Sequence, residues 1–402
     1  MSKWKETKII DIADFNLNSI NKDFGFNVIE YIDISSVEKG RLLCSQKVKL
    51  EEAPSRARRR IKKNDILISS VRPNLEHYYF VKDCSENTIV STGFVVITPK
   101  KNTHPYFLYC LLTTKEFTQY LTMVANSHTS TYPSFNSNII SDSILPIPDF
   151  GEQKEIADVL SCLDDKIENL RKQNQTLEKI AQTLFKHWFI DFEFPNENGE
   201  PYKSSGGAMK PSELGEIPEG WRVGKLGDVT RLGTGKGLKK DDFNDNGYYP
   251  VLGANGEMGR TNNFLIEEQS ILTGRVGTIG TVSINYVKAW ISDNVIIINP
   301  DRILFYYIYF YLRKTNLKNL NRGSTQPLIT QGDLKQIDVI IPNEKITKDF
   351  QEFCQMLFWK KRLNDKTIQS LTKTRDTLLP KLMSGKLRIQ EENIIEEGNE
   401  TS

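Results

Sequence analysis

The chain has 402 residues, of which 38% are hydrophobic and 26% are charged, so it has an ordinary globular composition and enough length for two or three domains. Its net charge is +2, but five glutamates lie among the last twelve positions, so residues 1–390 carry +7. The longest apolar run, residues 303–312, is too short to span a bilayer, and no N-terminal secretion signal is visible. The five cysteines and four histidines show no disulfide or metal-ligand spacing. We therefore expect a cytoplasmic protein that binds no metal or cofactor itself and does not associate with a membrane.

The sequence repeats itself once. Three pairs of segments align in the same order, at offsets of 217, 201 and 194 residues: 4–12 with 221–229, 91–99 with 292–300, and 130–133 with 324–327. Because the matches stay in order while the offset shrinks stepwise, we interpret the chain as a duplicated unit that has changed in loop length.

The first part of each unit alternates short strands with turns rich in Gly, Asn and Pro, and contains one helix. In the first unit the predicted strands are residues 27–34, 65–71, 89–98 and 140–147, and the helix begins at Pro105, a residue suited to the first helical position. In the second unit the predicted strands are 248–252, 270–273, 295–299 and 337–341, and the helix is 304–317. This order predicts a mixed α/β module without strict βαβ alternation.

Each unit ends in a long helix. From Ile156 to Trp188 the apolar residues follow steps of four and three, a heptad pattern of coiled-coil type in which Asn174 takes one core position. Asp149 followed by Glu152 predicts an N-terminal cap. The second helix, from about Pro342 to Gly385, has a less regular apolar pattern. We predict that the two helices pack antiparallel and that Asn174 fixes their register at some cost in stability.

These patterns predict an α+β protein with two pseudo-symmetric mixed α/β domains separated by two long antiparallel coiled-coil-like helices. The expected segments are a first domain at 1–148, a first helix at 149–192, an exposed linker at 193–220, a second domain at 221–342, a second helix at 343–388, and a disordered acidic tail at 389–402.

A basic segment of the first domain indicates contact with DNA. Between residues 47 and 63, eight basic side chains oppose two acidic ones, and such a run can neutralise phosphates and read guanine edges. We take a Gly-rich stretch before residue 241 as its equivalent in the second domain, and two further arginines follow matching strands. The predicted DNA-binding residues are Arg56, Arg58, Arg59, Arg60, Lys62, Lys63, Arg72, Lys236, Lys239, Lys240, Arg275 and Arg322. A solvated loop remains the alternative for the basic segment.

Three motifs resemble specificity subunits of type I restriction-modification enzymes. They are Glu213-Leu-Gly-Glu-Ile-Pro-Glu-Gly-Trp221, which opens the second domain, Leu184-Phe-Lys-His-Trp-Phe-Ile-Asp-Phe192, which closes the first helix, and Leu378-Leu-Pro-Lys-Leu-Met-Ser-Gly385, which closes the second. The resemblance covers essentially the whole chain, including the order of its two units.

This resemblance implies two target-recognition domains that read the two halves of a split, asymmetric sequence in double-stranded DNA. It also implies two helices that set the spacer and dock two methyltransferase subunits, with restriction-translocase subunits joining for cleavage. S-adenosylmethionine and ATP with Mg are then used by those partners and not by this chain. No base preference carries over, because the recognition domains vary greatly within the family.

Motifs of catalysis are incomplete. Asn299-Pro300-Asp301 lacks the second proline and the aromatic residue of the amino-methyltransferase motif, and the stretch 233–237 departs from a phosphate-binding loop. The segment from Pro148 to Lys154 imitates a nuclease pattern but is too compact for carboxylates that must converge from different strands. We therefore expect a non-catalytic specificity subunit. Two alternatives stay open: a stand-alone two-headed DNA-binding adaptor or regulator, and an enzyme with unrecognised methyltransferase or nuclease motifs.

Overall fold

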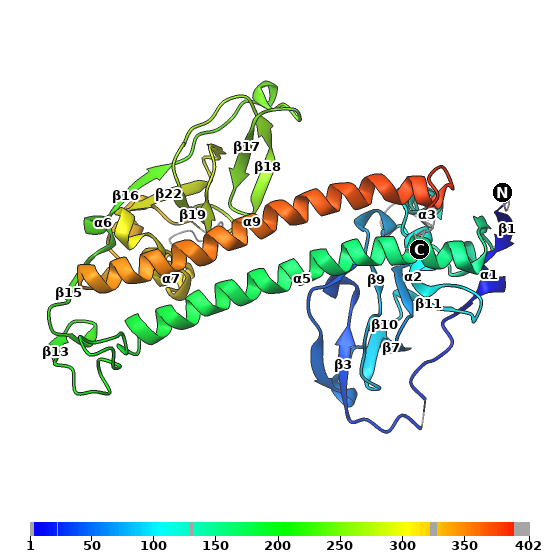
Figure 1. The fold of residues 1–402 in the computed structure, drawn as a ribbon, viewed down its shortest axis with the longest axis horizontal. Helices are drawn as coiled ribbons and strands as arrows, with labels where there is room; N and C mark the ends of the chain where they lie inside the picture. Colours follow the sequence, from blue (N-terminus) through cyan, green and yellow to red (C-terminus); the bar gives the residue numbers. More distant parts are fainter. Residues whose placement is uncertain (1–3, 22, 129–131, 322–327, 390–402) are drawn as a thin grey trace, which may run out of the picture. The chain divides into compact units, whose positions relative to one another are not determined.

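The structure is a computed structural model, and it describes residues 4–21, 23–128, 132–321 and 328–389. The chain forms two compact units: Met1–Asn169 with Thr367–Ser402, and Leu170–Lys366. Each unit contains one half of both long helices, α5 (Phe150–Phe189) and α9 (Glu344–Met383), which are continuous in Figure 1. The two helices are therefore shared between the units and are not bodies of their own. The acidic tail from residue 390 lies outside the described residues.

The first unit is built on two four-stranded sheets. One is antiparallel, with β2 (Ala13–Phe15), β11 (Phe94–Pro99), β8 (Ile66–Ser69) and β9 (Tyr78–Phe80) in that order. The other has the order β6 (Gln46–Lys49), β3 (Val28–Ile32), β10 (Thr88–Ser91) and β7 (Ala57–Arg60), and its β10 runs parallel to β3. A separate pair joins β1 (Lys5–Lys8) to β12 (Ile144–Ile147).

Helices complete the first unit. α2 (Pro105–Leu112) begins at Pro105 as predicted, and α3 (Lys115–His128) follows it. Two single-turn helices, α1 (Ile9–Ile12) and α4 (Asn138–Ser141), also form, so the prediction of one helix was wrong. The core joins Ile97 of the sheet, Phe107 of α2, Leu160 of α5 and Leu382 of α9.

Two predicted strands of the first unit are interrupted. The apolar run 89–98 divides at Thr92-Gly93 into β10 and β11, which belong to different sheets. A Cβ on Gly93 would lie 2.5 Å from the Ile34 Cδ1, so a larger residue here would require the Ile34 side chain to shift. The segment 140–147 begins within α4 and becomes a strand only at Ile144. Hydrophobic content alone does not distinguish one buried strand from two.

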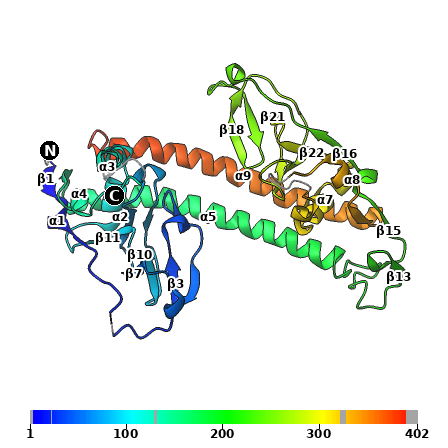
Figure 2. The same cartoon turned by 180° about the vertical axis from the view of Figure 1, so that it is seen from behind.

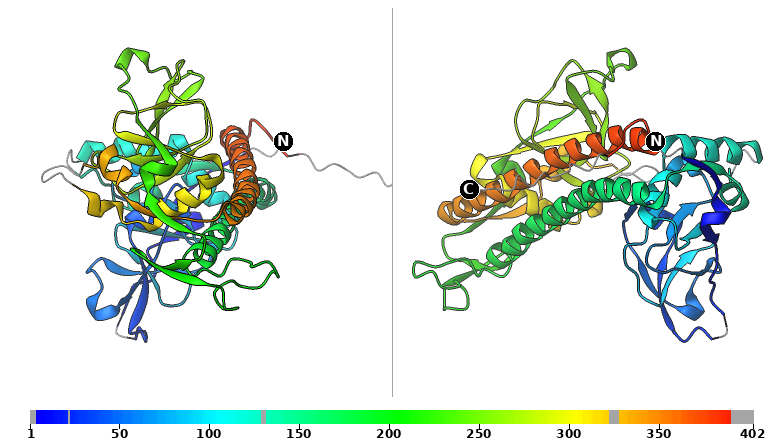
Figure 3. Two further views of the ribbon diagram at one scale, coloured as in Figure 1. Left: turned by 90° about the vertical axis from the view of Figure 1, so that its left-hand side faces the viewer. Right: turned by 45° about the vertical axis from the view of Figure 1, so that its right-hand side comes forward.

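The second unit repeats this plan with one strand fewer. Its antiparallel sheet has the order β16 (Thr230–Thr234), β22 (Val295–Pro300), β19 (Ser270–Gly274) and β20 (Val282–Asn285). Its second sheet has only β18 (Gly256–Thr261), β17 (Tyr249–Gly253) and β21 (Trp290–Ile291), and β21 runs parallel to β17 as β10 does to β3. β15 (Arg222–Lys225) pairs with β23 (Asp338–Ile341). Figure 3 shows these sheets in green and yellow, and the repeated pairings confirm the predicted duplication.

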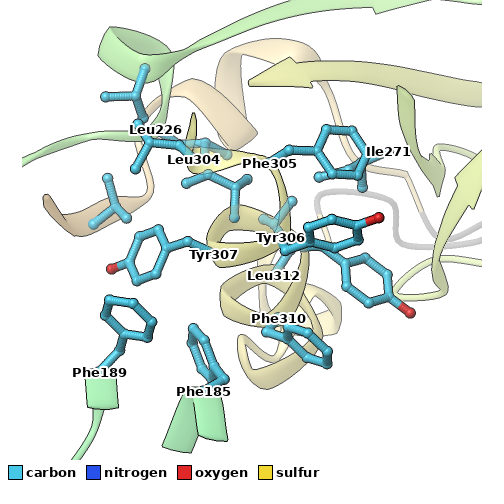
Figure 4. Packing of buried hydrophobic residues seen from close by; sticks show 14 of the residues in the cluster. Phe185, Phe189, Leu226, Ile271, Leu304, Phe305, Tyr306, Tyr307, Phe310 and Leu312 are labelled. Atoms are coloured by element: carbon cyan, nitrogen blue, oxygen red, sulfur yellow. The ribbon is translucent and has the colours of Figure 1, made fainter. Parts of the chain in front are cut away.

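Aromatic side chains dominate the core of the second unit. Phe189 of α5 packs against Tyr307 of α7 (Phe305–Lys314), with ring centres 4.8 Å apart, and against Phe350 of α9 at 5.0 Å. Figure 4 shows Phe185 and Phe189 directed toward Tyr307 and Phe310. The long apolar run near residue 303 is thus a buried core helix, which ends at Lys314 rather than at residue 317. In the described residues, no helix has the length and apolar character needed to cross a bilayer.

The predicted exposed linker is partly folded. Within residues 193–220, β13 (Met209–Ser212) and β14 (Gly215–Pro218) form a hairpin, and Phe194 and Ile217 are buried. The Phe194 ring stacks on Trp221, with their centres 5.0 Å apart. The prediction of a wholly exposed linker was wrong, because the turn-forming residues marked the loops but not the few apolar anchors between them.

The two long helices pack antiparallel within each unit (Figure 2). In the first unit Asp164 pairs with Arg375 at 2.7 Å and Glu152 with Arg388 at 3.6 Å. In the second unit Asn364 lies against Asn174, and Lys361 pairs with Glu178 at 2.9 Å. Positions on the later segment fall as those on α5 rise, which confirms the predicted direction. The N–H of Glu152 donates to Asp149 at 3.0 Å, the predicted cap, and the Glu152 carboxylate also accepts a bond from Trp4.

Candidate nucleic-acid interface

Arg72 lies at the end of β8, beside the turn that separates β10 from β11. The N–H of Ser70 donates to Gly93 O of that turn at 2.8 Å. Arg72 has a left-handed backbone, with φ 48° and ψ 60°, and its N–H donates to Pro133 O at 2.8 Å. The guanidinium carbon lies 5.1 Å from the centre of the Tyr132 ring. Both side chains are exposed at this edge of the unit.

Arg56 lies on the other side of the same turn. The N–H of Thr92 donates to Arg56 O at 2.8 Å, which places Arg56 at the start of β7 next to the turn. Arg58 is exposed two residues along, and its Nε donates to Ser55 O at 3.2 Å. The turn at Thr92-Gly93 is therefore flanked by cationic side chains from both sheets.

The side chains of Arg59 and Arg60 make contacts within the first unit. The Arg59 guanidinium donates to Asn16 Oδ1 and to Phe94 O, and burial lowers the pKa of this group. Arg60 lies 5.5 Å from the centre of the Phe24 ring. The sequence grouped both with their exposed neighbours, but alternation along β7 turns Arg59 toward the opposite face from Arg58. The basic run is thus not one uniform surface for a ligand, because Arg59 serves the packing of the unit.

Lys62 and Lys63 lie at the far end of β7. The N–H of Lys62 donates to Asp65 at the start of β8, at 2.8 Å. Lys63 lines a pocket with His104, Tyr106 and Asp165, beside α5. Because β7 has four residues, its ends are separated by roughly 10 Å. The basic segment that is continuous in the sequence is therefore divided between the two ends of β7.

The second unit repeats the arrangement around its own turn. Arg275 follows β19, and its N–H donates to Asn294 O at 2.8 Å. The N–H of Lys236 donates to Ile291 O at 2.8 Å, so the exposed Lys236 lies on the other side of the turn at residues 292–294. A Cβ on Gly235 would lie 2.1 Å from Ser292 O, so only glycine allows this approach. Arg275 makes the backbone contacts that Ser70 makes in the first unit, two residues before Arg72, and Lys236 comes from a different segment than Arg56. Both nevertheless place a cation beside the turn.

The supposed equivalence of the two basic stretches is wrong. Lys236, Lys239 and Lys240 lie between β16 and β17, which corresponds to the segment between β2 and β3. The place of β7 is taken by one isolated bridge between Ile266 and Ala289, followed by Glu267 and Glu268. The composition of a loop does not show which loop of the other unit it corresponds to. Similar charge in two loops therefore did not mean that they lie at the same place in the fold. Lys239 and Lys240 are exposed, and Arg322 lies outside the described residues.

Asn174 lies between α5 and α9 within the second unit. Its Nδ2 donates to Asp365 at 2.7 Å, and its Oδ1 accepts a bond from Asn364 Nδ2 at 2.9 Å. Asn174 is 6% exposed and Asn364 is 2% exposed, so each amide has its partner in a largely dry environment. The sequence pointed to Asn174 but missed Asn364 as its partner. Both residues interrupt an apolar pattern, and antiparallel pairing of the two interruptions is the signal that identifies the contact.

An ion-pair cluster lies beside this amide pair. Glu178 of α5 accepts bonds from Lys361 of α9, at 2.9 Å, and from Arg313 of α7. Burial alone would raise the pKa of Glu178, but the two cations outweigh it and lower the pKa below its ordinary value. In the described part of the chain, no three His, Cys, Asp or Glu side chains converge as metal ligands. The arrangement therefore offers cationic and amide groups for binding and register.

Comparison with known proteins identifies the family. The model of the type I restriction modification DNA specificity domain matches residues 1–179 and 218–373, the two halves of the repeat. The chain belongs to this family. The type I restriction enzyme HindI specificity subunit of Haemophilus influenzae is 29% identical over 96% of this chain and 100% of that protein. The MjaIX specificity subunit of Methanocaldococcus jannaschii is 32% identical over 82% of this chain and 79% of its own.

A solved structure shares the fold of this family member. The type I restriction-modification S subunit from M. genitalium superposes with a TM-score of 0.60 over 94% of this chain and 96% of that one. The two sequences are 16% identical, so the likeness concerns the fold alone.

Proposed function

We propose that this chain is the DNA specificity subunit of a type I restriction-modification complex, and that each domain reads one half of a bipartite, asymmetric target. The observation that carries this proposal is the arrangement built twice around a turn between two sheets. Arg72 and Arg56 flank that turn in the first unit, and Arg275 and Lys236 flank it in the second. Equivalent scaffolds with different side chains suit two half-sites of different sequence.

We infer that catalysis belongs to partner subunits. The family is described by DNA specificity, and the methyltransferase and nuclease motifs of this sequence are incomplete. Two methyltransferase subunits, using S-adenosylmethionine, would bind along α5 and α9, and restriction subunits, using ATP and Mg, would join them in the cytoplasm. An exposed apolar stripe on α9, formed by Met356, Trp359 and Leu363, supports docking on this helix.

An exchange of domains tests the division of labour. Residues 1–145 are replaced by the matching segment of a relative, and modified sites in the host genome are mapped by single-molecule sequencing. We expect one half of the recognised sequence to change and the other to persist, because each unit carries its own basic turn. The matched control replaces residues 221–342 and should change the other half. A change of both halves by either exchange contradicts independent reading.

We also infer that Asn174 and Asn364 fix the register of α5 against α9. A shift by one heptad moves a helix by about 10 Å, which corresponds to about three base pairs at 3.4 Å each. Replacement of both residues by leucine should raise thermal stability and loosen discrimination against altered spacer lengths, because the apolar seam no longer selects one alignment. The measurement is binding of the assembled methyltransferase to duplexes whose spacer is one to three base pairs longer or shorter. Unchanged spacer preference in the double variant excludes this role.

A further inference from the structure

We propose that Arg72 and Tyr132 together form the base-reading element of the first domain, and that the first half-site contains a guanine bound by Arg72. In this arrangement Tyr132 orients the guanidinium and packs against the neighbouring base. The inference rests on the proposed function, and it adds the identity of a base and a specificity role for a tyrosine that carries no charge.

The backbone around this pair is fixed on both sides. The N–H of Arg72 donates to Pro133 O at 2.8 Å, and the N–H of Phe135 donates to Ser70 O at 3.0 Å. Val71 and Ser134 form a β-bridge between these two bonds. The residues that follow Tyr132 are therefore bonded to the end of β8, so the two side chains are presented from the same edge. A reading group that is already positioned loses less conformational entropy on binding.

The contact between the two side chains suits guanine recognition. The guanidinium carbon of Arg72 lies 5.1 Å from the centre of the Tyr132 ring, which is the range of a cation–π contact. Stacking uses the face of the guanidinium, whereas guanine O6 and N7 are bound by its N–H edge, so one arginine can make both contacts. Tyr132 is 66% exposed, and a large aromatic ring held in solvent at a basic edge is placed to meet a base.

The backbone of Arg72 has a left-handed conformation. This conformation costs a non-glycine residue about 1 kcal/mol or more, and it persists where the surrounding structure fixes it. The second unit solves the same corner differently: the left-handed residue there is Gly277, with φ 73°, and Arg275 precedes it. The first unit thus keeps an arginine at a position where glycine would be less strained.

The test is selection of bound duplexes from a library with both half-sites randomised. The complex of this chain with its methyltransferase subunits is used, as wild type and as the variants Arg72→Lys, Tyr132→Ala and Arg56→Ala. We expect Arg72→Lys to reduce the preference for guanine at one position of the first half-site by about tenfold or more, because lysine lacks the bidentate fork. Tyr132→Ala should weaken preference at that position and the adjacent one. Arg56→Ala should weaken all sequences evenly, as loss of a phosphate contact does.

The second half-site serves as an internal control for folding, because it should be selected unchanged by every variant. An Arg72→Lys consensus identical to that of the wild type, or an even loss across all positions, overturns the inference while leaving the proposed function intact. A wild-type complex that selects no bipartite sequence overturns both.

Discussion

The two domains share their order of strand pairing and differ at one sheet edge. In the first unit that edge is the strand β7, which carries Arg58 to Arg60. In the second it shrinks to the bridge at Ile266, followed by two glutamates, one of which pairs with Lys288 at 3.4 Å. The central strands β11 and β22 keep the same neighbours in both units. A duplicated fold can therefore change the charge on its surface by rebuilding one sheet edge, while the pairing of the buried strands stays the same.

The largest effect expected from this comparison is on stability, at Arg59. Arg59→Ala removes the bonds to Asn16 Oδ1 and Phe94 O and should cost the first unit about 2–3 kcal/mol, because both acceptors lose a charged donor. Urea unfolding monitored by hydrogen exchange measures this in the first unit. Arg58→Ala, at an exposed position of the same strand, should change stability by less than about 0.5 kcal/mol. Equal stability of the two variants contradicts an internal role for Arg59.

In the second unit the corresponding internal contact is the ion-pair cluster at Glu178. Glu178→Gln should destabilise this unit by about 2 kcal/mol at neutral pH, because the carboxylate holds both Lys361 and Arg313. The pKa of this carboxyl is lowered in the folded chain, so its contribution is present above the ordinary value of 4.5 and is lost as the pH falls through the folded value.

The measurement is the difference in unfolding free energy between wild type and Glu178→Gln from pH 7 down to pH 3. This difference should shrink below about pH 4.5. Asp165→Asn, at a more exposed ion pair with Lys82, should show little difference at any pH. A gap that stays constant with pH contradicts the assignment.

A smaller effect is expected on the salt dependence of DNA binding. The double variant Arg56→Ala with Arg58→Ala should lower the slope of log affinity against log salt by about 1.8, because each lost phosphate contact removes about 0.9. Between 50 and 200 mM salt the wild type should then lose about tenfold more affinity than the variant. Lys62→Ala with Lys63→Ala, at the other end of β7, is the matched control. If the control flattens the slope more, the phosphates lie along the far end of the strand.

The smallest effect is expected when a positive charge is added to the second unit at the edge that lacks β7. Glu268→Lys places a cation at the edge where the first unit has β7, and should steepen the salt slope by up to about 0.9, or about threefold over the same salt range. Glu197→Lys makes the same change of charge at an exposed position far along the sequence from that edge. Equal slopes for both variants mean that the second edge does not approach DNA.

The sequence was sufficient to predict the features whose patterns occur in both units. The duplication, the buried strands and the antiparallel helices follow from repeated apolar patterns, because burial imposes them in each copy. What it did not reveal depends on contacts between distant residues. Alternation along β7 separates Arg59 from Arg58, but the sequence does not show which face is covered, because the partners of Arg59 are Phe94 of β11 and Asn16, which follows β2. The division of the run 89–98 depends in the same way on distant strands, because β10 pairs with β3 and β7 while β11 pairs with β2 and β8.

The division of the two long helices between the units has a consequence for biosynthesis. The second unit is one continuous stretch, Leu170–Lys366, whereas the first needs Met1–Asn169 together with Thr367–Ser402. As the chain leaves the ribosome, the first domain emerges first but lacks Leu382 and Met383, which fill its core. The second unit can fold before the last segment of the first unit has been translated. By pairing α5 with α9 it closes most of a loop of about 200 residues before the last segment arrives. The domain that is translated first is thus the last to be completed. Premature termination after residue 366 would leave the second unit complete and would remove part of the core of the first.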